Sequence, residues 1–314
     1  MGLGANLPRV CIVKRSASEA GVCLAPTMNT DVLSTRQVAT LLGVGEATVK
    51  RWADAGEIEC FRTPGGHRKF RLRDVTGFVQ KRQYETPGVL PDGVPPGADE
   101  LGDAAVEHFK NAALRGETPA LVAQLAALRL RGHDLPTLFD EVVAPALHRI
   151  GEEWERRKLS VAEEHVAAQA ILDAIARSQP LAEPPGEPVR PDRGTAIVAA
   201  VAGEQHDIAA RMAACLLRAR GFEVLAPLAQ TPARDLADLI LRSRAVLVAL
   251  SSTIADGVEE QVRLSAAAAA QTGGKVLVGG PGMQKARLPE EERLVTSMRM
   301  LDAEAAAAGR RKTR

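Results

Sequence analysis

Cysteine is scarce in this chain and follows no ligand pattern. The 314 residues contain four cysteines, which lie far apart at Cys11, Cys23, Cys60 and Cys215. There is no Cys-x-x-Cys pair, and no histidine stands at the spacing of a zinc site. We therefore expect reduced thiols without a structural role, and a cytoplasmic protein.

Long hydrophobic runs and an excess of charge of one sign are also absent. No apolar run approaches the ~20 residues of a membrane-spanning helix, and the first thirty residues hold no apolar stretch long enough for a signal peptide. We expect no membrane partner. The net charge of +1 excludes a uniformly basic protein that coats nucleic acid, so any such contact must come from local basic clusters.

Two patterns of enzyme chemistry are missing as well. Gly203 and Gly221, around the first helix of the C-terminal third, do not follow the G-x-G-x-x-G spacing, so a nicotinamide cofactor is not expected. No set of nucleophile and base is visible, and we therefore expect a protein that is not an enzyme.

The patterned sequence is divided by stretches rich in proline and glycine. A chain of this length suggests two or three domains. The expected division is a disordered extension (1–30), a small helical head (31–83), a linker (84–99), a helical bundle (100–179), a proline-rich linker (180–194), an α/β domain (195–301) and a tail (302–314).

The head has the spacing of a winged helix-turn-helix. Ser34 is a good N-cap for a helix over 35–42, and a second helix is expected over 46–55. Two strand-like runs follow around Pro64-Gly65-Gly66 as a hairpin wing, and a third helix over 73–82 closes the unit. The alternative is a small helical domain with a solvated basic hairpin.

This segment resembles the DNA-binding head of MerR-type regulators. The resemblance implies that the partner is double-stranded operator DNA, read by a helix in the major groove while the wing grips phosphates. We expect the hairpin to be tipped with His67, Arg68 and Lys69. The residues implied to contact DNA are Thr48, Lys50, Arg51, Arg62, His67, Arg68 and Lys69.

Helix signals over 100–179 predict a four-helix bundle, because short connections favour antiparallel neighbours. The expected helices cover 100–115, 119–131, 135–157 and 161–178, and Pro145 should kink the third. Trp154, Glu164 and His165 form a W-x9-E-H pattern at one end. Each alone is typical of a core or a solvated surface residue. Together, and followed by small residues, they indicate room for a bulky ligand.

The last domain alternates strands with helices, which predicts a doubly wound, Rossmann-like parallel sheet. Its first strand ends in Glu204-Gln205-His206, at the carboxyl edge where such sheets bind ligands. Later strands end in Ser251-Ser252-Thr253 and Gly279-Gly280. Taken alone, His206 reads as an ordinary satisfied polar residue. Glu204 can accept one imidazole N–H of His206, however, which fixes the tautomer and raises basicity as in metal-binding histidines.

These strand ends resemble the cobalamin-binding domain, whose signature is D-x-H-x-x-G, then S-x-L or S-x-T, then GG. The resemblance implies that His206 replaces the cobalamin's benzimidazole on cobalt, while the nucleotide tail inserts into the sheet. It also implies cofactor contacts by Glu204, Asp207, Ile208, Ala209, Ser251, Thr253, Gly279 and Gly280.

A MerR-type head, a W-x9-E-H bundle and a cobalamin domain resemble, in this order, the CarH/LitR photoreceptor repressors. By that resemblance Trp154 and Glu164 cover the 5′-deoxyadenosyl group of adenosylcobalamin, with His165 nearby. The implied function is repression by an adenosylcobalamin-bound homo-oligomer, a tetramer in the dark, which releases its operator when light cleaves the cobalt–carbon bond.

Two residues depart from the family pattern. Ala209 stands for the signature's glycine, and its methyl can crowd the inserted tail. Glu155 stands where the best-known members have a histidine able to cap cobalt after photolysis, so we expect water, hydroxide or another histidine such as His148 there. Three alternatives stay open: a MerR-type regulator without light response, dependent on cobalamin or not; a corrinoid carrier module for methyl transfer; and a degenerate domain that serves only oligomerisation.

Overall fold

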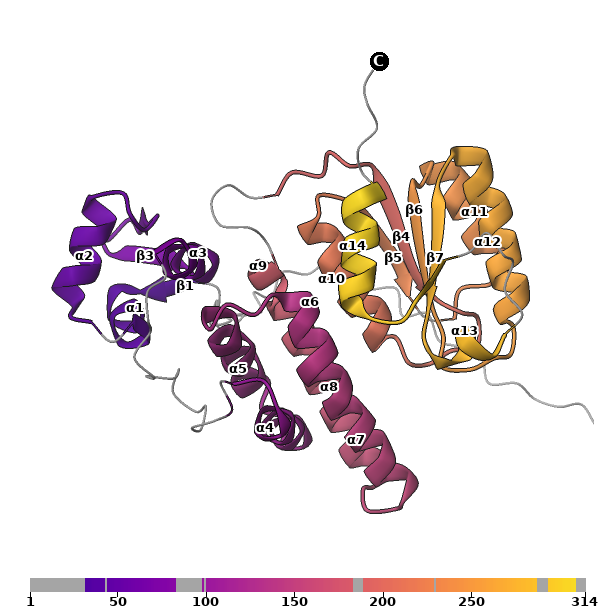
Figure 1. Cartoon of the computed structure of the whole chain (residues 1–314), viewed down its shortest axis with the longest axis horizontal. Helices are drawn as coiled ribbons and strands as arrows, with labels where there is room; N and C mark the ends of the chain where they lie inside the picture. Colours follow the sequence, from indigo (N-terminus) through magenta and orange to yellow (C-terminus); the bar gives the residue numbers. More distant parts are fainter. Residues whose placement is uncertain are drawn as a thin grey trace, which may run out of the picture.

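The computed structural model describes residues 32–42, 44–82, 98, 100–182, 189–228, 230–286 and 293–308. The expected extension (1–30), nearly all of the first linker and residues 183–188 of the second lie outside this part of the chain. Figure 1 shows a small head, a helical bundle and an α/β domain following one another along the chain.

The head is a winged helix-turn-helix. Helices α1 (Thr35–Leu42), α2 (Glu46–Asp54) and α3 (Leu72–Arg82) surround a small antiparallel sheet of order β1-β3-β2, with β1 (Val32–Ser34), β2 (Phe61–Arg62) and β3 (Arg68–Arg71). Ser34 caps α1, because its Oγ accepts the Gln37 N–H at 3.3 Å while the Gln37 side chain accepts the Ser34 N–H at 2.8 Å. In the core the rings of Trp52 and Phe78 lie 4.8 Å apart.

Four helices form the bundle: α4 (Asp103–Leu114), α5 (Thr118–Leu130), α7 (Ala144–Glu155) and α8 (Val161–Arg177). The expected third helix is interrupted, since α6 (Leu135–Leu138) and the π-helical segment η1 (Phe139–Val143) precede α7. Pro145 explains the interruption, because a proline lacks an N–H and its ring displaces the carbonyl four residues back. Helix α7 also ends before residue 157, where Arg157 has a left-handed φ of 56°.

Residues 179–182 form the short helix α9 (Gln179–Ala182), where the sequence predicted the start of a linker. Leu181 is buried, and its carbonyl accepts the Nε–H of Arg129 at 3.0 Å. The side chain of Gln179 donates to the carbonyl of Cys215, in the α/β domain, at 3.2 Å. The end of the bundle is therefore attached to the α/β domain before the linker begins.

The α/β domain contains a five-stranded parallel sheet of order β5-β4-β6-β7-β8. Its strands are β4 (Thr195–Ala200), β5 (Glu223–Leu228), β6 (Leu247–Ser251), β7 (Lys275–Gly279) and β8 (Arg293–Val295). After β4 the chain adds β5 on one side of it, and then adds β6, β7 and β8 in turn on the other side. The carboxyl ends of β4 and β6 therefore flank the topological switch point, the usual ligand site of such sheets.

Helices cover both faces of this sheet (Figure 1): α10 (Ile208–Ala219) and α14 (Met298–Ala308) on one, α11 (Ala233–Ser243) and α12 (Val258–Thr272) on the other, with the short α13 (Pro281–Lys285) after β7. Alternate residues of β4 pack on opposite faces, Val198 toward α10 and Ile197 toward α11 and α12.

Helix α14 continues to Ala308, into the range expected as a tail. Two features hold this end of the helix in place. Ala305 is buried, and Glu304 forms ion pairs with Lys275 at 2.5 Å and Arg293 at 2.6 Å.

The three bodies share packing contacts. Helix α3 of the head lies on α5 and α9, α8 packs on α10, and α6 contacts α14. One cluster of buried side chains runs from the head through the bundle to the α10–α14 face, and a separate cluster fills the α11–α12 face. None of the helices described here is both long and apolar enough to cross a membrane.

Candidate functional site

His206 lies in the loop after β4, at the topological switch point. Its side chain is 70% exposed, and its Nδ1 lies 2.7 Å from Oε1 of Glu204, which also accepts the His206 backbone N–H at 2.8 Å. Because a carboxylate only accepts hydrogen bonds, we assign the ring proton to Nδ1. This leaves the lone pair of Nε2 available, as metal ligation by a histidine requires.

Glu204 is buried and fully hydrogen-bonded. Its Oε2 accepts from both the backbone N–H and the hydroxyl of Thr253, each at 2.6 Å. Burial by itself raises the pKa of Glu204, but the hydrogen bonds from Thr253 and His206 outweigh burial and lower the pKa to about 2. The carboxylate is therefore ionised at neutral pH, and it connects the loops after β4 and β6.

The residues at the ends of β6 and β7 make different contacts. Thr253 donates a hydrogen bond to the buried carboxylate of Glu204, whereas Ser251 lines a cavity. Between them Ser252 is buried and donates its hydroxyl to the Ile254 carbonyl at 2.7 Å. Gly280 has a φ of 100°, and a Cβ there would lie 2.3 Å from the Ser252 carbonyl oxygen. Glycine at 280 therefore allows the two loops to pack together.

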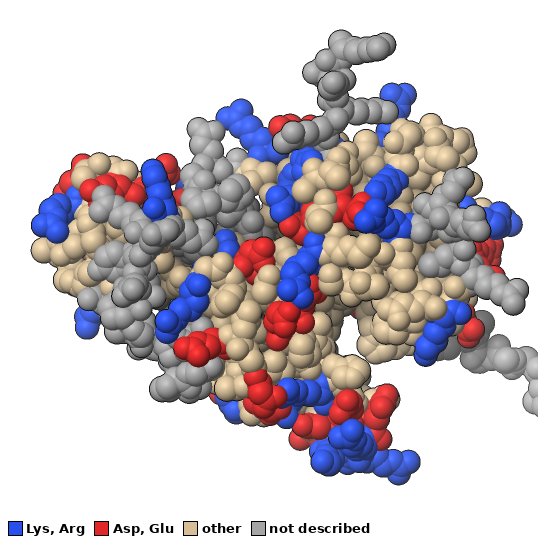
Figure 2. All heavy atoms as spheres, viewed as in Figure 1, with Lys and Arg blue, Asp and Glu red and all other residues tan. Residues whose placement is uncertain are grey.

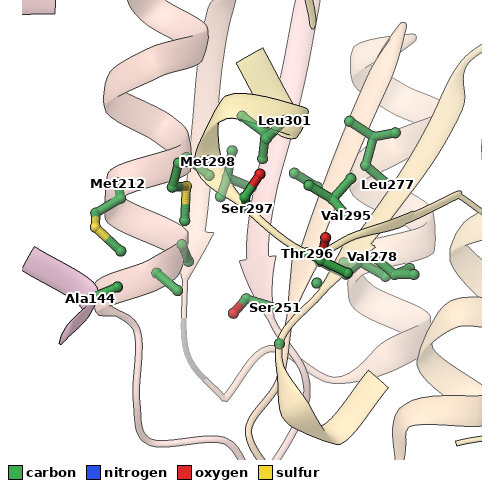
Figure 3. Close-up of a pocket in the computed structure, with 18 of the residues that line it drawn as sticks. Ala144, Met212, Ser251, Leu277, Val278, Val295, Thr296, Ser297, Met298 and Leu301 are labelled. Atoms are coloured by element: carbon green, nitrogen blue, oxygen red, sulfur yellow. The ribbon is translucent and has the colours of Figure 1, made fainter. Parts of the chain in front are cut away.

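A cavity of about 240 Å³ lies between the sheet and α10 (Figure 3). Its walls are mainly apolar, and it brings together the predicted residues Ala209, Ser251, Gly279 and Gly280. The sequence did not indicate several other lining residues, because Met212 reads as an ordinary core position of α10 and the three-residue strand β8 is too short to produce a pattern. These include Met212, Val295, Thr296, Ser297 and Met298.

Two predicted cofactor residues lie at the start of α10 and outside this cavity lining. The carboxylate of Asp207 accepts from the guanidinium of Arg211 at 2.9 Å. Ile208 is half-buried against the core. Their contacts with a cofactor stay predictions.

The bundle residues of the W-x9-E-H pattern lie where α7 meets α8. The side chains of Trp154 and His165 are exposed, and His165 Nε2 lies 3.8 Å from Oε2 of the half-buried Glu164. Val161 and Val166 nearby are also exposed, although large apolar side chains are usually buried. This end of the molecule therefore presents apolar surface beside a carboxylate.

The bundle end and the sheet edge lie on the same side of the molecule. Figure 1 shows the α7–α8 connection projecting on the side where α13 lies, and Figure 2 shows an open gap between the two. In the part of the chain that the structure describes, no hydrogen bond or ion pair joins Trp154, Glu164 or His165 to His206. His148, on α7, lies at the surface with Nε2 3.4 Å from Glu152.

A second hollow, in the head, lies between the two helices of the helix-turn-helix and the wing. It is lined by the predicted residues Lys50, His67, Arg68 and Lys69, and also by Arg36, which the sequence did not single out because it lies on α1. Of the other predicted contacts, Thr48 is half-buried, and Arg51 and Arg62 are exposed outside the lining.

The expected wing tip needs a correction. Arg68 and Lys69 are not at the tip, because they belong to β3 and pair with β2. The turn itself runs from Thr63 to His67, whose backbones are hydrogen-bonded at 3.0 Å. The guanidinium of Arg68 bonds the carboxylate of Asp54 in α2, which fixes the wing to that helix.

Three parts of the chain match known families. Residues 32–83 match a helix-turn-helix domain family. Residues 105–178 and residues 194–301 match two families described as B12 binding domains. The matches coincide with the head, the bundle and the α/β domain.

Individual proteins are similar to all or part of this arrangement of domains in the extent of the chain that they match. The HTH-type transcriptional repressor CarH of Myxococcus xanthus is 29% identical over 247 residues, which cover 71% of this chain and 79% of that protein. The transcriptional repressor DcmR of Methylorubrum extorquens is 39% identical over 54 residues, 17% of this chain and 20% of that protein. The monomethylamine corrinoid protein of Methanosarcina barkeri has a similar fold, with a TM-score of 0.51 at 14% identity, covering 63% of this chain and 95% of that one.

The two B12 binding domains support cobalamin binding, and the helix-turn-helix supports DNA binding. The chain thus combines a helix-turn-helix domain with two B12 binding domains, and over 247 residues it is similar to the transcriptional repressor CarH.

Proposed function

We propose that this chain is a transcriptional repressor that responds to light: it binds operator DNA as an adenosylcobalamin-bound oligomer in the dark and releases DNA when illuminated. The observation that carries the proposal is His206, oriented by an ionised carboxylate at a sheet edge that shares one side of the molecule with Trp154 and Glu164. Adenosylcobalamin, when bound, would supply a cobalt–carbon bond that visible light breaks.

The residues at the sheet edge fit the lower side of a corrinoid. His206 would ligate cobalt through Nε2, because its Nδ1 proton is engaged by Glu204. The cavity beside Ser251 would hold the nucleotide tail, since its apolar walls suit a flat aromatic base and the serine hydroxyl offers one polar contact. Gly279 and Gly280 leave this part of the wall free of side chains.

The bundle end fits the upper side. Trp154 would cover the adenosyl group, and Glu164 would accept a hydrogen bond from a ribose hydroxyl, with His165 beside it. The exposure of Trp154, Val161 and Val166 supports this role, because it leaves large apolar side chains free to contact a ligand. Loss of the adenosyl group would remove the contacts of Trp154 and Glu164 together.

The switch requires a definite free energy. To change a two-state equilibrium from almost fully assembled to almost fully dissociated, the two states must differ by about 5 kcal/mol in ligand binding. The combined contacts of an indole and a buried hydrogen bond are of this order. In the dark state Lys50 and Arg51 would reach the major groove, and the wing would contact phosphates.

Reconstitution in the dark tests this proposal. The full chain is incubated with adenosylcobalamin, and absorption, size-exclusion elution and a DNA gel shift are recorded before and after green light. We expect binding, a larger species in the dark, and a light-dependent loss of both assembly and DNA affinity. Cyanocobalamin, which has no photolabile alkyl group, serves as the control and should give no light response.

Other outcomes identify the alternatives. Absence of cobalamin uptake would mean a domain that serves only oligomerisation. Uptake without a light-dependent change would favour a regulator without light response or a corrinoid carrier for methyl transfer. The carrier is the second candidate because the bundle and sheet share the fold of a corrinoid protein, and transfer of a methyl group from the methylcobalamin-loaded chain to a thiol would support it.

A further inference from the structure

The cavity beside Ser251 is built by two domains. Most of its lining comes from the α/β domain, but Asp140 and Ala144 of the bundle also contribute, and Figure 3 shows Ala144 at its edge beside Met212. Asp140 lies in η1, the π-helical segment that precedes Pro145. The shape of the cavity therefore depends on how the bundle lies against the sheet.

Asp140 binds the first turn of α14. Its Oδ1 accepts the backbone N–H of Met298 at 2.7 Å, and its Oδ2 accepts the backbone N–H of Arg299 at 3.0 Å and the Arg299 Nε–H at 3.2 Å. The Asp140 side chain is only 12% exposed. Within α14, Ser297 caps Met300 at 3.1 Å, so Asp140 satisfies amides that the helix itself leaves free.

The π-helical segment gives Asp140 this orientation. Phe139, Val142 and Val143 of the same segment are buried in the core. Asp140 and Glu141 face the α/β domain instead, where Glu141 accepts from the guanidinium of Arg299 at 2.8 Å. Both acidic residues thus bind Arg299, but only Asp140 lines the cavity and bonds to backbone amides.

We propose that Asp140 is a positioning residue for the part of the cofactor that enters the cavity, the nucleotide tail. By capping α14 it holds Ser297 and Met298 in the cavity wall, so the bundle must be docked for the wall to be complete. Occupation of the cavity and docking of the bundle then favour each other, because linkage between two such equilibria is reciprocal. The inference rests on the proposed function for the identity of the ligand.

Two corrinoids that each carry one cyanide, one with and one without the nucleotide tail, test the proposal. Binding of cyanocobalamin and of aquacyanocobinamide, which lacks the nucleotide tail, is measured by absorption titration of the full chain. We expect Asp140→Ala to weaken cyanocobalamin binding about tenfold, since charge-assisted hydrogen bonds are lost, and to change cobinamide binding by less than about twofold. The matched control Glu141→Ala should leave both affinities close to those of the wild type.

A measurement without ligand tests the contact itself. Hydrogen exchange of the Met298 and Arg299 amides in the cofactor-free chain should be faster in Asp140→Ala, and Asp140→Asn, which keeps one acceptor oxygen, should restore part of the protection. If Asp140→Ala weakens both corrinoids equally, or neither, Asp140 does not position the tail. If the wild-type chain binds neither corrinoid, the proposed function fails together with the ligand assigned here, and a changed exchange rate would then show a purely structural cap.

Discussion

Glu204 determines what His206 can do. One of its oxygens holds the imidazole and the other holds the loop after β6 through Thr253. A histidine on an exposed loop would otherwise sample several rotamers and both tautomers. The low pKa of about 2 keeps the carboxylate charged over the whole physiological range, so the acceptor that orients His206 is present throughout this range.

Replacement of Glu204 by glutamine should lower the free energy of unfolding at pH 7 by about 2 kcal/mol. Both oxygens of the Glu204 carboxylate accept hydrogen bonds, so the amide nitrogen of a glutamine would face a donor and lose them. Because the pKa in the folded chain is depressed from its ordinary value of 4.5 to about 2, the contribution of the carboxylate is complete above pH 4.5 and is lost as the pH falls toward 2. Urea unfolding at several pH values should show the difference from the wild type shrinking over this window; a constant difference would contradict it.

Ala209 differs by one methyl group from the glycine of the family signature, so its replacement tests whether this methyl group crowds the cavity. It lies in the first turn of α10 and lines the cavity. Ala209→Gly should tighten cobalamin binding by enlarging the cavity, and should cost about 0.5–1 kcal/mol of folding stability because glycine is a poor helix former. Absorption titration and urea unfolding measure the two effects. Ala214→Gly on the same helix, outside the cavity, should leave affinity unchanged, and equal affinities of all three proteins would refute the crowding by Ala209.

The wing is the element with the clearest electrostatic role. Arg68 is engaged by Asp54, whereas Lys69 lines the same hollow as Lys50. Because Arg68 of β3 bonds Asp54 of α2, the basic side chains of β3 are held at a fixed position relative to α2. The wing and α2 should therefore act on DNA as one rigid surface.

Lys69→Ala should weaken DNA binding and reduce the slope of log K against log salt concentration by about 1, as expected for the loss of one phosphate contact. Fluorescence anisotropy with double-stranded DNA at several salt concentrations measures this slope. Lys285→Ala, an exposed lysine on α13 far from the head, is the control. An unchanged slope in Lys69→Ala would exclude a phosphate contact by this residue.

Local signals predicted those elements that local contacts stabilise. Ser34 caps α1, and a capping box of Ser160 and Glu163 starts α8, with the backbone N–H of Ser160 donating to Glu163 at 2.8 Å. The strand ends were also correctly placed, since each follows a continuous apolar run. The sequence did not predict the π-helical segment, because a proline indicates that a helix is interrupted but not which structure replaces the regular helix.

The rest of the site depends on contacts between distant residues. Asp140 and Met298 are 158 positions apart, and no spacing in the sequence relates them. Strand β8 has three residues, too few for a period to be recognised. The cavity that these elements close was therefore not predicted, although Ser251 and Gly279 on its wall were.

At the scale of the whole molecule, the head is docked on the bundle and does not stand apart from it. Helix α3 lies against α5 and α9, and the buried cluster continues from Trp52 through the bundle into the α10–α14 face. Helix α9 touches the head, the bundle and α10, which makes it the point where all three parts meet.

Trp154→Phe would leave Trp52 as the one tryptophan, since the chain has two. In this variant, Trp52 fluorescence, which reports on the head, and far-ultraviolet circular dichroism should give the same unfolding midpoint in urea, because docking couples the domains. Adding Leu181→Ala should cost about 2–4 kcal/mol and separate the two transitions. Two separate transitions before Leu181 is changed would show that the head folds independently.

The division of the core by the sheet has a practical consequence. The α11–α12 face packs apart from the cluster of buried side chains that runs from the head through the bundle to the α10–α14 face. Arg242 on α11 is exposed on this outer face. A site-specific tether at position 242 would hold the protein on a sensor surface with the hollow of the head and the cavity beside Ser251 left free, so that release of DNA could be followed in real time as a lamp is switched on.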